Sequence, residues 1–144
     1  MIAFAMRSAS ARYEARMNAA LERLGPTPRP RELVTGILTA LLPVDDQQQQ
    51  DARIALAFQS YAATRPAAAD GLRADNVQLC GFLAEQLSSA SGVSVTEDHE
   101  HAATALLGMA EGLGLQVVST GLPVERALAA LRAQIDLTLT ALAP

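Results

Sequence analysis

The segment from Ala102 to Val118 constrains the fold most, because it carries two helix faces of different character. On one face apolar residues recur at intervals of three and four, as in a helix that packs on its own core. These residues are Ala103, Leu106, Ala110, Leu113 and Val117. The other face carries Ala105, Gly108 and Gly112. Glycine inside a helix costs about 1 kcal/mol relative to alanine, so a tight helix crossing is needed in compensation. We therefore predict a dimer interface on this second face.

A second amphipathic segment follows and completes the chain. Pro123 is expected in its first turn, where the missing N–H of proline is harmless, although Leu122 stands where Ser or Thr would normally cap a helix. Its apolar stripe comprises Val124, Leu128, Leu131, Ile135, Leu139 and Leu142. We predict that the last two helices form a four-helix bundle across the two-fold axis of a homodimer. The interface residues predicted on the last helix are Leu128, Leu131, Ile135 and Leu139.

Four more helices are predicted from their start and stop signals. The first runs from about Ile2 to Leu24, and the second from Pro30 to just before Pro43. The third begins at Asp45, which forms a capping-box pattern with Gln48, and ends at Arg65. The fourth runs from about residue 67 to 89, and the fifth begins at Thr96. With 50% hydrophobic and 3% aromatic residues and no alternating strand pattern, the 144 residues predict one all-α domain, 1–144.

The order of the last two helices, with the sequence EGLGLQ in the first of them, resembles the C-terminal half of TetR-family transcriptional regulators. Upstream, Leu41-Leu-Pro-Val-Asp-Asp followed by Arg53-Ile-Ala-Leu-Ala-Phe is similar to the branch typified by the choline-responsive repressor. Ile54 and Ala55 occupy the neighbourhood where that branch often has an aromatic residue. The similarity spans about Arg7 to Leu142. It implies a six-helix effector-binding and dimerisation domain, in which ligand occupancy shifts the first helix and lowers operator affinity.

DNA binding is expected only through a domain that this chain does not contain. TetR-family proteins begin with a three-helix unit whose helix-turn-helix enters the major groove, and no such unit precedes Met1. The start of the chain resembles the helix that joins the two halves of these proteins. A net charge of -4 gives no overall attraction to nucleic acid. The lone Cys80, which we place in the core, and the lack of a signal or membrane-spanning segment predict a cytoplasmic location without membrane contact.

A ligand pocket between helices is predicted from the large and polar side chains of a chain otherwise rich in Ala and Leu. The predicted ligand-binding residues are Met17, Phe58, Tyr61, Gln78, Phe82 and Met109. Each of these alone is more often a core residue, but together they suit a mostly apolar pocket with a few polar contacts. No pair of buried Lys or Arg residues is evident, which disfavours an anionic ligand. We expect a neutral or weakly polar small molecule as the effector.

Catalytic and metal-binding patterns are nearly absent. His99 and His101 lie among carboxylates, but side chains two residues apart on a helix point about 200° away from each other. We therefore expect both histidines to lie in the solvated first turn of a helix, and we expect no bound metal and no cofactor. Arg12 and Arg16 are read as surface residues. The sequence shows no set of acid, base and nucleophile residues that could converge in an active site, so we do not expect an enzyme. The alternatives are a stand-alone helical dimer that acts as a small-molecule carrier or antirepressor-like partner and, less favoured, a small helical enzyme.

Overall fold

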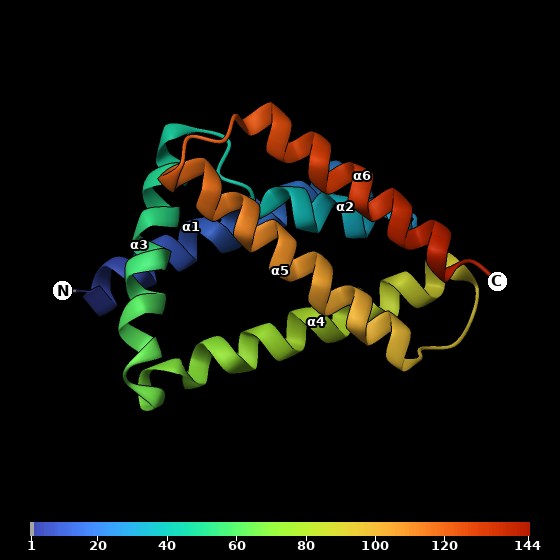
Figure 1. Cartoon of the computed structure of the whole chain (residues 1–144), viewed down its shortest axis with the longest axis horizontal. Coiled ribbons are helices and arrows are strands. Elements are labelled where there is room, and N and C mark those ends of the chain that lie inside the picture. Colours follow the sequence, from blue (N-terminus) through green and yellow to red (C-terminus); the bar gives the residue numbers. More distant parts are fainter. Residues whose placement is uncertain (1) are drawn as a thin grey trace.

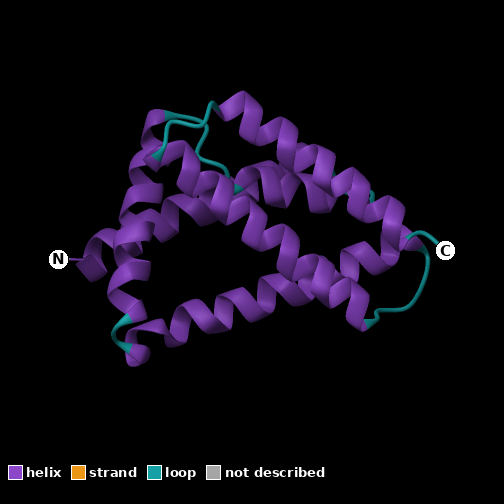
Figure 2. Ribbon diagram, in the orientation of Figure 1, coloured by secondary structure: helices purple, strands orange, loops and turns teal. Residues whose placement is uncertain are grey.

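The computed structural model describes residues 2–144, and the side chains from Phe4 onward. Its elements are α1 (Ile2–Arg23), α2 (Pro30–Ala40), α3 (Asp46–Ala63), the short 3-10 helix η1 (Pro66–Ala69), α4 (Asp70–Ser91), α5 (Glu97–Ser119) and α6 (Val124–Leu142). Within residues 2–144 every regular element is a helix, which confirms the all-α, six-helix prediction (Figure 2). Met1, where the joining helix was predicted to start, lies outside the described residues.

Local hydrogen bonds explain where the helices begin and end. Asp45 caps α3 by accepting a hydrogen bond from the backbone N–H of Gln48 at 2.8 Å. The side chain of Gln48 reaches back to the N–H of Val44, one residue earlier than in a standard capping box. Gly92 adopts a φ of 74° and ends α4, a left-handed conformation that glycine accepts without strain. The predicted fourth helix divides instead, because Pro66 opens a separate 3-10 turn before α4.

The helices form a wedge that is open towards α3. In Figure 1, α4 and α5 lie close together at the C-terminal end of α4 and diverge towards the opposite end, which α3 spans. Helix α2 lies inside the assembly and contacts α1, α4, α5 and α6. The chain therefore has a packed end, where α2, α4, α5 and α6 meet, and an end at which α1 and α3 close over a wider space.

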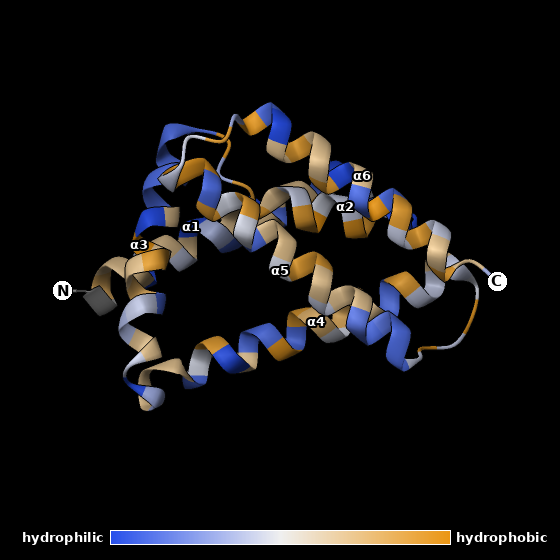
Figure 3. Ribbon diagram, in the orientation of Figure 1, coloured by the Kyte–Doolittle hydropathy of each residue, from blue (hydrophilic) through white to orange (hydrophobic). Residues whose placement is uncertain are grey.

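The hydrophobic core fills the packed end. Its fully buried side chains include Val34, Leu38, Leu83, Leu87, Leu106, Leu131 and Ile135. The predicted core stripe of α5 is confirmed, since Ala103, Leu106, Ala110 and Val117 are buried and Leu113 is half-buried. Cys80 is half-buried against the same core, as expected. Helix α5 alone among residues 2–144 is long and apolar enough, by length and composition, to span a membrane, and one of its faces packs into the core (Figure 3).

The stripe of α6 that was predicted to meet a second chain also belongs to this core. Leu131 and Ile135 have no exposed surface within a single chain. Leu128 and Leu139 are half-buried and pack against the same cluster. The predicted interface role of Leu131 and Ile135 is therefore wrong, because their own chain buries them completely. The interface role of Leu128 and Leu139, which keep some exposed surface, stays a prediction.

Candidate functional site

A cavity of about 1100 Å³ is lined by residues of α4 and α5 and of α1, α2 and α3. Its size matches that of sites that enclose a small organic molecule, which are about 300 to 1,000 Å³. Its apolar lining includes Met17, Leu21, Ile37, Leu41, Leu72, Leu79, Phe82 and Leu107. Because five helices and η1 contribute lining residues, a bound molecule would touch most of the elements of the domain at once.

The glycines of α5 form part of the cavity wall. Gly108 and Gly112 line the cavity together with Glu111 and Leu115. A Cβ atom added at Gly108 or Gly112 would have no neighbour within 4 Å. These glycines therefore widen the cavity, and no other helix of the chain packs closely against them. Their predicted place in a dimer interface stays a prediction, because open space beside them in a single chain is compatible with a second chain there. Ala105, the third residue of that predicted face, is exposed and does not line the cavity.

Three of the six predicted ligand-binding residues line the cavity, namely Met17, Gln78 and Phe82. Phe58, Tyr61 and Met109 do not. The rings of Phe58 and Tyr61 stack with centroids 6.4 Å apart, and the Arg65 guanidinium lies 4.2 Å from the Tyr61 ring on the exposed side of α3. Phe58 also borders a shallow depression beside α1, and Met109 packs against the core.

The face of α3 that turns inward was not predicted, because it carries few large apolar residues. It contributes Gln48, Asp51, Ala52, Ala55, Leu56 and Gln59 to the cavity lining. Phe58 and Tyr61, which were predicted to line the pocket, lie about one residue out of phase with this face. Aromatic side chains on this helix thus mark a face beside the cavity, while small and polar residues mark the cavity itself.

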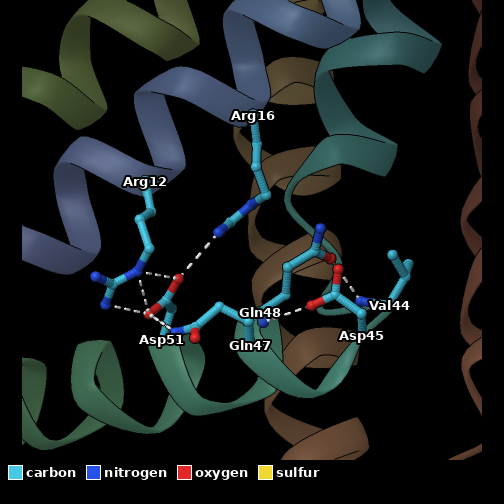
Figure 4. A network of polar contacts seen from close by, with 7 residues as sticks. All are labelled: Arg12, Arg16, Val44, Asp45, Gln47, Gln48 and Asp51. Atoms are coloured by element: carbon cyan, nitrogen blue, oxygen red, sulfur yellow. Dashed lines mark hydrogen bonds and ion pairs between the residues drawn. The ribbon is translucent and has the colours of Figure 1, made fainter.

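A buried carboxylate ties α3 to α1 (Figure 4). Asp51 is only 4% exposed and accepts hydrogen bonds from Arg12, Arg16 and Gln47, with the shortest contact at 2.6 Å from Arg12 Nη2 to Oδ1. Burial opposes ionisation of Asp51, but the hydrogen bonds from Arg12, Arg16 and Gln47 outweigh it, so the pKa of this carboxyl lies below its usual value. Asp51 is therefore ionised and holds two arginines of α1 in place.

This network corrects the surface role expected for Arg12 and Arg16. Arg16 donates from Nη1 to Asp51 Oδ2 at 3.0 Å and lines the cavity. Its Nε is buried and has no hydrogen-bond partner within the described residues. The guanidinium also lies 6.0 Å from the ring centre of Tyr13. The four-residue spacing of Arg12 and Arg16 puts both on one helix face, which was the available signal, but nothing in the sequence identified Asp51 as their partner.

Three further carboxylates line the cavity without a basic partner among residues 2–144: Glu14 on α1, Asp75 on α4 and Glu111 on α5. Burial, and then the charges of Glu111 and Asp75, raise the pKa of Tyr13 to about 12, against the opposing effect of Arg16. Burial also raises the pKa of Glu111. The polar part of the cavity is therefore acidic, a feature that sequence reasoning missed.

His99 has a structural role outside the cavity. It is only 2% exposed, and its Nδ1 accepts from the Thr96 N–H at 3.1 Å while Nε2 lies 3.0 Å from Ser91 Oγ. His99 thus links the end of α4 to the start of α5, which corrects its expected place in a solvated turn. His101 is exposed, as expected. The described residues contain no cluster of three or more His, Cys, Asp or Glu side chains placed to bind a metal ion.

The described residues thus form an all-helical wedge with a cavity beside a long first helix. The chain belongs to the family described as BetI-type transcriptional repressor, C-terminal, which matches residues 30–140. A crystal structure of a transcriptional regulator from Rhodococcus sp. Rha1 has the same fold, with a TM-score of 0.79 and 29% sequence identity over 98% of this chain and 72% of that chain. No curated protein is similar enough in sequence to be matched.

Proposed function

We propose that this chain is the effector-sensing and dimerisation domain of a TetR-like repressor, and that a small molecule binds in the cavity between α4 and α5. The cavity itself carries the proposal, since a volume of about 1100 Å³ with mainly apolar walls is far larger than a packing defect. The family supports a role in transcriptional regulation. Binding of a small-molecule effector would explain why the cavity is not filled by side chains.

Helix α1 is the element through which occupancy would act. Tyr13 and Met17 on α1 line the cavity, while Arg12 and Arg16 bind the α3 carboxylate beside it. A ligand that binds more tightly to one placement of α1 than to another shifts the population towards that placement. In the proposed mechanism this movement reaches the DNA-binding part of the repressor and releases it from the operator. A shift from 1:99 to 99:1 needs a difference in affinity of about 10⁴-fold between the two placements.

The proposed dimer uses the outer faces of α5 and α6. With its core stripe buried, α6 exposes small and apolar residues at a spacing of four, which lie along one face: Ala129, Ala133, Leu137 and Ala141. Leu137 is 64% exposed and is the one large apolar side chain of this face, so a second chain packed here would bury it. This face takes the place of the buried Leu131 and Ile135 in the proposed interface on α6, and the half-buried Leu128 and Leu139 would lie at its edge.

Filling the cavity tests the proposed binding site. A Cβ atom at Gly112 would meet no neighbour within 4 Å, so Gly112→Leu should direct its side chain into the open space. Gly81→Leu is the matched control, because Gly81 is an exposed helical glycine of α4 that has equal room for a Cβ and does not line the cavity. The probe is the neutral fluorescent dye phenylnaphthylamine, titrated into the parent chain and into each variant.

We expect the parent and Gly81→Leu to bind the dye alike, and Gly112→Leu to lose at least about tenfold in affinity. Circular dichroism should show the same helix content in all three proteins. Undiminished dye binding by a folded Gly112→Leu variant, or no binding by the parent, would contradict the proposed site.

A further inference from the structure

One arginine on the wall of the cavity keeps most of its hydrogen-bonding capacity free. Arg16 lines the cavity, is 25% exposed and donates a single hydrogen bond, from Nη1 to Oδ2 of Asp51 at 3.0 Å. Each nitrogen of a guanidinium group can donate. Neither Nε nor Nη2 of Arg16 has a partner among the described residues, and Nε is buried. Because an unpaired buried donor is costly, this edge of Arg16 needs an explanation.

The neighbouring Arg12 uses the edge that Arg16 leaves free (Figure 4). Arg12 binds Asp51 through Nε at 3.0 Å and through Nη2 at 2.6 Å. Arg16 reaches the same carboxylate through Nη1, so its own Nε and Nη2 remain available. The N–H groups of this edge point in the same direction and suit an acceptor group that approaches in the plane of the guanidinium.

The guanidinium of Arg16 is already held in position. Asp51 binds it from α3, and the ring of Tyr13, one turn earlier on α1, has its centre 6.0 Å from the guanidinium carbon. The cavity residues that follow Asp51 on α3 are Ala52 and Ala55, whose small side chains leave room on this wall. A donor that is fixed before binding lowers the entropy cost of holding a ligand.

The charges of the wall favour an uncharged acceptor. Asp51 already opposes the positive charge of Arg16. The other acidic residues of the wall, Glu14, Asp75 and Glu111, are exposed and would repel an anion that entered the cavity. A carbonyl oxygen has two lone pairs and no net charge, so it can accept from both N–H groups without this repulsion.

We propose that the effector is an uncharged molecule with an apolar body and a carbonyl group, whose oxygen accepts hydrogen bonds from Nε and Nη2 of Arg16. This inference rests on the proposed function, because it assigns a ligand chemistry to the same cavity. The apolar body would lie against a wall that includes Met17, Leu79 and Phe82. The proposal keeps the neutral effector expected from the sequence and names the polar group that orients it.

Four compounds with one aromatic body test the chemistry of the ligand: the ketone acetylnaphthalene, the hydrocarbon ethylnaphthalene, the amine naphthylethylamine and the carboxylate naphthoate. Each is titrated at neutral pH into the parent chain loaded with phenylnaphthylamine, and displacement of the dye gives its affinity. The ketone should bind at least about tenfold more tightly than the amine or the carboxylate.

Substitution of the arginine identifies the donor. Arg16→Met removes the N–H groups but keeps a long side chain, so it should lower ketone affinity by at least about tenfold and hydrocarbon affinity by less than about twofold. Arg12→Met is the matched control, because Arg12 binds the same carboxylate but does not line the cavity. It should change either affinity by less than about twofold. Circular dichroism should show the same helix content in the parent and both variants.

Infrared spectroscopy observes the hydrogen bond directly and, in the parent chain, needs no substitution. The C=O stretching band of isotopically labelled acetylnaphthalene should lie at lower frequency in the complex than in a hydrocarbon solvent, because donated hydrogen bonds weaken the carbonyl bond. Arg16→Met should return the band towards its position in the solvent. Tyr13→Phe, which removes the neighbouring hydroxyl on the cavity wall, should leave the band where it is in the parent.

The outcomes separate the two proposals. The carbonyl proposal is overturned if the amine or the carboxylate binds as tightly as the ketone, if Arg16→Met weakens ketone and hydrocarbon equally, or if the carbonyl band of the bound ketone is unshifted. It is also overturned if Tyr13→Phe, and not Arg16→Met, abolishes the shift, or if the ketone fails to bind although the dye binds. In each of these cases the cavity remains the ligand site. If neither the dye nor the ketone binds the parent, or if Gly112→Leu leaves ketone binding intact, both proposals fail.

Discussion

Arg12 and Asp51, thirty-nine residues apart in the chain, join α1 to α3 through contacts from both Nε and Nη2 of the arginine. Asp51→Asn keeps the shape of the side chain but removes the charge that both arginines bind. We expect it to lower the free energy of unfolding by about 1 to 2 kcal/mol, a modest cost because Arg12 remains 41% exposed and is screened by solvent. Urea denaturation of the parent and the variant measures this difference.

Asp46→Asn is the control for this substitution, because Asp46 is an exposed residue of the same helix with no ion pair in the structure. It should change stability by less than about 0.5 kcal/mol. Equal effects of Asp51→Asn and Asp46→Asn would show that the contacts of Asp51 with α1 contribute nothing particular to stability.

The contribution of Asp51 should also depend on pH. Its pKa in the folded chain is lowered below the ordinary value of about 3.9, so its stabilising effect is fully present above that value. The effect is lost as pH falls through the lower folded pKa. The difference in unfolding free energy between the parent and Asp51→Asn should therefore be constant near neutrality and shrink in acid. A difference that grows on acidification would contradict this assignment.

The fold could be predicted well from the sequence, because helix boundaries and core-facing stripes depend on residues that are close together in the chain. The stop signals at Gly25 and Gly92 and the cap at Asp45 act on neighbouring residues, so they can be read without a structure. The stripe of α6 was equally visible, but periodicity shows only that Leu131 and Ile135 are buried. It does not say whether their own chain or a second chain buries them.

The site was harder to predict, because it depends on which helix faces meet. A cavity wall needs room as well as apolar surface, so Gly108 and Ala55 line it while the larger Phe58 does not. Helical periodicity searches for large apolar residues and therefore selects packed faces. Charged residues such as Glu111 are exposed in the structure as well, and only the arrangement of the helices shows that Glu111 lies on the cavity wall.

The two histidines of α5 provide a matched pair for testing the buried link between helices. His99→Ala removes the acceptor of the Thr96 N–H, the contact with Ser91 and a buried ring, and we expect a loss of about 1 to 3 kcal/mol. His101→Ala removes an exposed side chain and should cost less than about 0.5 kcal/mol. Thermal or urea unfolding compares the two. Similar losses for both variants would refute the structural role of His99.

The last prediction separates the two faces of α6. Leu137→Glu places a charge on the exposed face, and it should dissociate the dimer while leaving the helical fold intact, because Leu137 makes no contribution to the core. Leu131→Ala instead opens a cavity in the core and should destabilise each subunit by about 2 to 5 kcal/mol. Sedimentation equilibrium combined with urea unfolding distinguishes loss of association from loss of stability. Val77→Glu, at a 71% exposed position on α4, controls for adding a surface charge and should leave the oligomeric state unchanged. A parent chain that sediments as a monomer at micromolar concentration, or a Leu137→Glu variant that still forms dimers as tightly as the parent, would rule out this face of α6 as the interface.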